Sequence, residues 1–133
     1  MQDYTRLLVW QRARSLNVSM AEVARAFPPS LAPGLRAQLM RATMSIGATI
    51  AEGAGRESRP DFARFISMAA ASASEAEHHL TVASDLGLIE PGISARLAAR
   101  IIEVRRMLFG LRRALLAAED DDSKRGPADE LDS

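Results

Sequence analysis

Apolar residues recur at alternating spacings of four and three along most of this chain, which is the pattern of α-helices that each bury one face. The pattern is interrupted near prolines and glycines, so it predicts four helices. The apolar positions of the first two are Val9, Ala13, Leu16, Met20, Val23 and Phe27, then Leu35, Leu39, Ala42, Ile46, Thr49 and Gly53. Those of the last two are Phe62, Ile66, Ala69, Ala73, Ala76, Leu80 and Ala83, then Leu97, Ile101, Val104, Leu108, Leu111, Leu115 and Ala118.

Residues at the ends of these segments support the same division. Pro28 stops the first helix at Phe27, because proline restricts the residue before it. The second helix is expected to end at Gly53-Ala54-Gly55, where a glycine suits a C-terminal cap. Ser58 is a good N-cap for the third helix, and the fourth is expected to begin near Pro91.

The chain is predicted to be all-α, because no strand-like alternation competes with these patterns. The short connection 85–90 forces neighbouring helices to be antiparallel, so residues 1–118 are expected to form an antiparallel up-down four-helix bundle. The third helix has a run of small residues at 69–74. Small side chains let another backbone approach closely, either inside the bundle or between subunits.

Composition narrows the class of protein. A length of 133 residues suits one domain, and 47% hydrophobic with 26% charged residues is typical of globular proteins. No apolar run approaches the roughly 18 residues that cross a bilayer, and residues 1–3 do not resemble the start of a signal peptide. We expect a soluble cytoplasmic protein. The absence of cysteine excludes disulfides, thiolate zinc sites and cysteine nucleophiles.

The formal net charge of zero hides an asymmetry between the body and the end of the chain. Residues 1–118 contain 15 arginines against 10 acidic residues, whereas residues 119–133 contain 7 acidic residues against Lys124 and Arg125. The body is therefore +5 and the tail −5. With Leu131 as its one large apolar residue, the tail 119–133 is predicted to be disordered and acidic. It is hypothesised to fold back over the arginines and screen them.

The body's cations are all arginines, whose planar donor fork suits phosphate. On the fourth helix, the pair Arg105 and Arg106 is repeated seven residues later by Arg112 and Arg113. The candidate nucleic-acid-binding residues are Arg12, Arg41, Arg56, Arg59, Arg105, Arg106, Arg112 and Arg113. The competing interpretation is that these arginines form only the solvated faces of amphipathic helices.

A polar stripe accompanies the second helix. Ser45, Thr49, Glu52 and Arg56 follow one another at spacings of four, three and four, so they share one side, and Glu52 and Arg56 are placed to pair. Two interpretations stay open for Glu52 and for Glu75 of the third helix. In the first, the two glutamates belong to a buried hydrogen-bonding network at a subunit or ligand contact. In the second, they are solvated charges beside the core.

Catalytic and metal sites find little support. Glu75 and His78 have the Glu-x-x-His spacing of di-iron bundles, but such sites need a second copy and two further carboxylates. His78 and His79 are the only histidines in the chain. We expect no catalytic residues, no metal and no cofactor, and a protein that is not an enzyme.

Short motifs accompany the helical pattern. Residues 7–11 contain Leu-x-Val-Trp-Gln, and residues 45–53 read Ser-Ile-Gly-Ala-Thr-Ile-Ala-Glu-Gly. With further matches over most of residues 6–90, they resemble the four helix bundle proteins related to the 23S ribosomal RNA intervening-sequence protein and to Avd, the accessory subunit of diversity-generating retroelements. Gly47 and Thr49 stand where that family has proline and asparagine. The motif positions with an expected structural role are Trp10, Gln11, Ser45, Thr49, Glu52, Gly53 and Glu75.

The resemblance implies a ring-shaped homopentamer with a positively charged surface. We therefore expect a non-enzymatic oligomeric scaffold that binds structured RNA or DNA through its arginines. One alternative is an accessory subunit that docks a reverse transcriptase in a diversity-generating retroelement. Another is a purely structural protein-interaction module with no nucleic-acid role. The sequence does not identify the nucleic acid or the protein partner.

Overall fold

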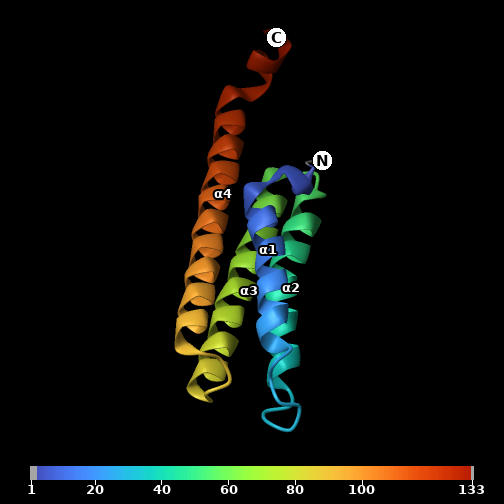
Figure 1. The fold of residues 1–133 in the computed structure, drawn as a ribbon. Helices are drawn as coiled ribbons and strands as arrows, with labels where there is room; N and C mark the ends of the chain where they lie inside the picture. Colours follow the sequence, from blue (N-terminus) through green and yellow to red (C-terminus); the bar gives the residue numbers. More distant parts are fainter. Residues whose placement is uncertain (1–2, 133) are drawn as a thin grey trace.

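Four long helices make up the structure, a computed structural model that describes residues 3–132, with side chains described as far as residue 125. A single 3-10 turn, η1 (Tyr4–Arg6), precedes the helices (Figure 1). The helices are α1 (Leu8–Ala24), α2 (Leu35–Ala54), α3 (Arg59–Asp85) and α4 (Pro91–Asp132). Within residues 3–132 there is no strand, so the predicted all-α class is confirmed.

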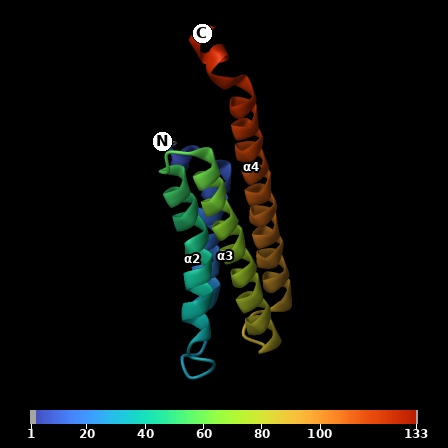
Figure 2. The ribbon, with the colours of Figure 1, turned by 180° about the vertical axis from the view of Figure 1, so that it is seen from behind.

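Successive helices run in opposite directions and lie side by side (Figures 1 and 2). In the described part of the chain, α1 packs against α2 and α4, and α3 packs against α2 and α4, while α1 and α3, like α2 and α4, lie diagonally across the bundle. This is the arrangement of an up-down four-helix bundle. None of the helices described is both long and apolar enough to span a membrane.

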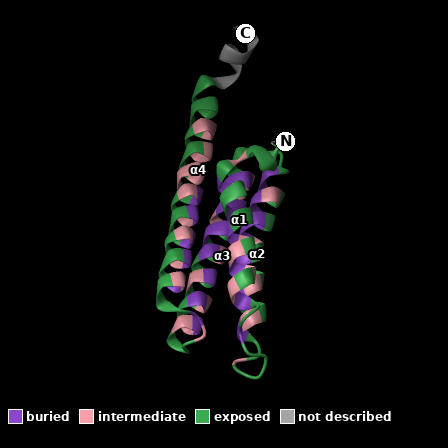
Figure 3. Ribbon diagram, viewed as in Figure 1, coloured by how far each residue is buried: buried purple, intermediate pink, exposed green. Residues whose placement is uncertain are grey.

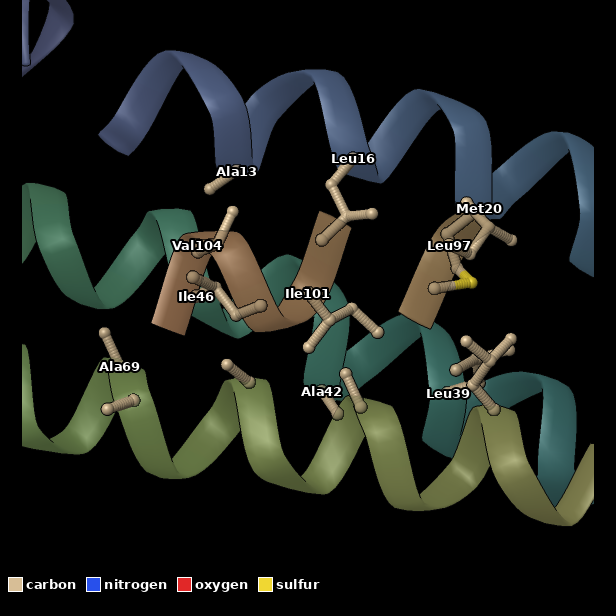
Figure 4. Close-up of a cluster of buried hydrophobic side chains, with 14 of the residues drawn as sticks. Ala13, Leu16, Met20, Leu39, Ala42, Ile46, Ala69, Leu97, Ile101 and Val104 are labelled. Atoms are coloured by element: carbon tan, nitrogen blue, oxygen red, sulfur yellow. The ribbon is translucent and has the colours of Figure 1, made fainter. Parts of the chain in front are cut away.

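The predicted apolar positions form one core between the helices. Leu16, Ile46, Ile66 and Ile101 come from four different helices, and each is fully buried. Figure 3 shows that buried positions lie on the inner faces of the helices, and Figure 4 shows Leu16, Ile46 and Ile101 in the core. Alanines such as Ala69 fill much of the space along α3, so its neighbours approach closely. These four core positions, one on each helix, are therefore correctly predicted from spacing alone.

The helix α4 is longer than the sequence pattern indicates. It continues beyond the end of the other three helices (Figure 1), whereas the apolar pattern stops at Ala118 and residues 119–133 were expected to lack regular structure. Extending an existing helix adds one hydrogen bond per residue without a new nucleation cost, and Asp122 also pairs with Arg59 of α3. Leu111 and Leu115 are only partly buried, because the shorter helices end beside them.

Local capping explains where α3 begins and ends. The hydroxyl of Ser58 accepts a hydrogen bond from the backbone N–H of Asp61 at 3.2 Å, which confirms Ser58 as the N-cap. At the other end, the N–H of Leu88 donates to the carbonyl of Ala83 at 3.0 Å. Gly87 supplies the positive φ of 74° that this C-terminal turn requires.

Candidate nucleic-acid interface

The four predicted arginines of α4 lie on two sides of the helix. The guanidinium of Arg105 donates to the Glu77 carboxylate at 3.0 Å and to the Ser74 hydroxyl at 3.3 Å, so it faces α3. Arg112, seven residues later, lies on the same side. Arg106 and Arg113 are exposed.

Carboxylates neutralise two of these four side chains. Arg105 pairs with Glu77 of α3, and Arg106 lies 3.5 Å from Glu103 one turn away on α4. Among the described side chains, Arg112 and Arg113 have no carboxylate within 4 Å. These two therefore keep their full charge for a ligand.

Two further predicted arginines lie where α2 turns into α3. Arg56 stacks over the ring of Phe65, 4.5 Å from its centroid, and its Nε lies 3.6 Å from the carboxylate of Asp61. Arg59 forms an ion pair with Asp122 of α4. Both guanidinium groups are therefore engaged within the chain, although about half of each side chain remains exposed.

Arg12 and Arg41 lie on different helices from the rest. Arg12 is on α1 and lines a small hollow together with Arg100 and Glu103 of α4. Arg41 is exposed on α2, which does not contact α4. The eight predicted arginines thus do not form one surface. The four of α4 lie on two sides of that helix, and Arg56 and Arg59 lie at the turn between α2 and α3. Arg12 lies beside α4 on α1, and Arg41 lies apart on α2.

The sequence prediction overlooked two arginines that the structure places beside α1. The guanidinium of Arg100 donates to the hydroxyl of Ser19 at 2.7 Å and to that of Ser15 at 3.1 Å. Arg96 lines the same side of α4 one turn earlier. Their spacing of four, directly next to the core positions of α4, is the signal that would have identified them.

The motif residues Trp10 and Gln11 support the start of α1. Trp10 makes an edge-to-face contact with Tyr4, with ring centroids 5.1 Å apart, and its indole covers Gly47 of α2. The side-chain amide of Gln11 donates to the backbone carbonyl of Thr5 at 2.9 Å. Both residues therefore fix the η1 turn against the bundle.

The polar stripe of α2 is partly a contact with α3. The hydroxyls of Ser45 and Ser72 lie 2.9 Å apart, and Thr49 is buried with its hydroxyl 3.5 Å from that of Ser45. Glu52, by contrast, is exposed. The expected Glu52–Arg56 pair is wrong, because Arg56 turns toward Asp61 of α3 instead.

A glycine of the run 53–55 caps α2, as the sequence predicts. The C-cap is Gly55, and Gly53 lies inside the helix against α3. A Cβ atom on Gly53 would lie 2.6 Å from the Cβ of Phe65 and 2.9 Å from the ring of Phe62. Gly53 is therefore needed because the two helices approach one another closely at this level.

Glu75 points to solvent, with 63% of its side chain exposed. Its carboxylate lies 3.6 Å from His79 at the next turn, and no contact joins it to His78. Among the described residues, no group of three or more histidine, aspartate or glutamate side chains is placed to hold a metal ion. In the single chain, Glu52 and Glu75 are thus solvated charges.

Comparison with known proteins supplies a family description. The model of a family described as 23S rRNA-intervening sequence protein matches residues 5–110. A crystal structure of a protein with unknown function from the S23 ribosomal protein family of Bacteroides thetaiotaomicron is similar, with a TM-score of 0.71 and 20% sequence identity. That similarity covers 79% of this chain and 98% of the other. No curated protein matches this chain.

Proposed function

The chain belongs to the 23S rRNA-intervening sequence protein family, and we propose that it is a non-enzymatic oligomeric scaffold that binds structured RNA or DNA through its arginine-rich surface. The observation that carries this proposal is the arginine repeat of α4. Arg105, Arg106, Arg112 and Arg113 lie along one helix, and Arg112 and Arg113 have no carboxylate within 4 Å among the described side chains. Guanidinium groups of this kind bind phosphates and release their counterions.

Self-association is the second part of the proposal, and a homopentamer is its specific form. Methionines Met44 of α2 and Met68 of α3 are 55% and 46% exposed, which suits burial by another copy of the chain. Assembly multiplies the positive body: five copies of a +5 body present about +25 before the acidic tails are counted. Nucleic-acid binding would then depend on many weak phosphate contacts with little sequence preference.

A charge-reversal experiment tests the binding part. The double variant Arg112→Glu/Arg113→Glu is expected to weaken binding of a fluorescein-labelled RNA hairpin on the order of tenfold at low salt, because it removes two phosphate contacts. The matched control, Arg25→Glu/Arg64→Glu, makes the same change of net charge directly after α1 and on α3, away from the α4 repeat. Equal affinity of the two variants would contradict a role for α4. Absence of any salt-sensitive binding by the wild type would favour a protein-interaction module instead.

A further inference from the structure

A groove runs between α1 and α4, on the side of α4 away from Arg105. It consists of two adjoining hollows of about 340 and 100 Å³ that share Arg100. Arg96 lines the larger hollow and Arg12 the smaller one. Three arginines from two helices therefore follow one another along the groove.

These three arginines carry uncompensated charge. Among the described side chains, Arg12, Arg96 and Arg100 have no carboxylate within 4 Å. Arg100 donates instead to two neutral hydroxyls, those of Ser15 and Ser19. These contacts hold its guanidinium in the groove without cancelling its charge.

The hydroxyls of Ser15 and Ser19 accept from Arg100 and can each still donate one hydrogen bond. A helical serine or threonine commonly donates to the carbonyl four residues earlier, as Thr43 does to Leu39 at 2.8 Å. Ser15 and Ser19 make no such bond and have no other acceptor in the described part of the chain. Each hydroxyl therefore accepts from Arg100 and keeps an O–H that points to no protein acceptor.

Two carboxylates also line the groove, and they limit its charge. Glu103 is 3.5 Å from Arg106, so part of its charge is already compensated. Glu22 of α1 is exposed and lines the larger hollow. The groove thus combines three guanidinium groups and two hydroxyl donors with one unpaired carboxylate, Glu22, at its edge.

The spacing of the cations indicates the kind of anion. Arg96 and Arg100 are one helical turn apart, about 6 Å along α4 at a rise of 1.5 Å per residue. Arg12 extends the row on the other side of Arg100, where it lines the smaller hollow with Arg100 and Glu103. A row of three cations is longer than one phosphate group, so it suits successive phosphates of one strand, each of which carries a negative charge. A single free phosphate would use only one end of this row.

We infer that the α1–α4 groove binds the phosphodiester backbone of one nucleic-acid strand through Arg12, Arg96 and Arg100, with Ser15 and Ser19 as additional donors. This inference rests on the proposed function and adds to it a second binding surface, on the opposite side of α4 from Arg105 and Arg112. Because the contacts are to phosphate and not to base edges, the groove contributes affinity without sequence preference.

The test measures binding of the full chain to the labelled RNA hairpin over a range of salt concentrations. Arg12→Glu/Arg96→Glu changes two exposed side chains and is expected to weaken binding on the order of tenfold. It should also reduce the slope of log affinity against log salt by about 1.5, since each phosphate contact contributes about 0.7 to 0.9. Arg25→Glu/Arg64→Glu is the control of equal charge. Glu22→Gln removes a negative charge from the groove. This second variant should therefore have the opposite effect and tighten RNA binding.

The outcomes separate this inference from the proposed function. If the wild type binds RNA and the groove variant behaves like the control, or if Glu22→Gln has no effect, the groove inference is wrong while the function stands. If the wild type shows no salt-dependent binding, both fail. A polyglutamate peptide that displaces the RNA at equal charge concentration would overturn the phosphodiester assignment in favour of an acidic protein segment.

Discussion

Arg59 of α3 and Asp122 of α4 form an ion pair although 63 residues separate them in sequence. The contact is made where α4 continues past the end of the bundle, so the first acidic residues of the tail lie beside the turn between α2 and α3. One arginine predicted to bind nucleic acid is therefore already occupied by a carboxylate of the same chain. Among the described side chains this is the one ion pair between the tail and a predicted arginine. That the tail folds back over the other arginines and screens them stays a prediction.

Removing the tail's charge should strengthen nucleic-acid binding. Asp122→Asn frees Arg59 and is expected to tighten binding of the RNA hairpin by about two- to fivefold, and deletion of residues 119–133 should tighten it further. Thermal unfolding of Asp122→Asn should hardly change, because exposed ion pairs contribute about 0 to 1 kcal/mol. Fluorescence anisotropy and circular dichroism measure the two effects.

The control for that experiment is Asp85→Asn, at the end of α3 remote from Arg59. It makes the same change of net charge and should have a smaller effect on RNA affinity. If Asp122→Asn and Asp85→Asn change the affinity equally, the Arg59–Asp122 contact has no specific role in screening.

The two buried glycines of α2 should respond oppositely to alanine. Gly53→Ala places a methyl group against Phe65 and Phe62 at distances under 3 Å, so we expect it to lower the free energy of unfolding by about 1 to 3 kcal/mol. Gly47→Ala meets its nearest atom, Nε1 of Trp10, at 3.6 Å, which is ordinary van der Waals contact. The higher helix propensity of alanine should then stabilise the protein by about 0.5 to 1 kcal/mol. Urea unfolding followed by circular dichroism measures both free energies of unfolding. If Gly53→Ala were as stable as the wild type, α2 and α3 would be able to move apart at this level at little energetic cost.

The hydroxyl pair between α2 and α3 should show energetic coupling. Ser45→Ala leaves the Ser72 hydroxyl without its partner and is expected to cost about 1 kcal/mol. A double-mutant cycle with Ser72→Ala should give a coupling energy of about 0.5 to 1.5 kcal/mol. Ser67→Ala is the comparison, since that hydroxyl bonds only to the carbonyl of Ala63 in its own helix. Additive effects of Ser45→Ala and Ser72→Ala would mean that the pair contributes nothing beyond its separate members.

The fold could be predicted from the sequence because the spacing of apolar residues determines which helix face is buried. Leu16, Ile46, Ile66 and Ile101 were each assigned to the core by spacing alone, and each is fully buried. The capping role of Ser58 was likewise evident from residue type. The end of α2 at residues 53–55 was also predicted, but a glycine near a helix end looks the same whether it forms a cap, as Gly55 does, or a close contact, as Gly53 does. Only the position of α3 distinguishes these two cases.

The candidate site was harder to predict, because charge alone does not show which partner a side chain meets. Arg56 could have paired with Glu52 on its own helix, but Asp61 across the turn is its partner in the structure. Arg96 and Arg100 were overlooked because the sequence does not show which helix their side chains face. Their significance comes from the hydroxyls of α1, which only the packing of α1 against α4 brings to them.

Light scattering of the full chain, alone and with the RNA hairpin at low and moderate salt, tests the central claim most directly. The oligomeric scaffold predicts a particle with five times the 14.4 kDa mass of one chain, which gains the mass of RNA at low salt and releases it as salt rises. A 14.4 kDa monomer would contradict the assembly, and a particle whose mass is unchanged by RNA at low salt would contradict nucleic-acid binding.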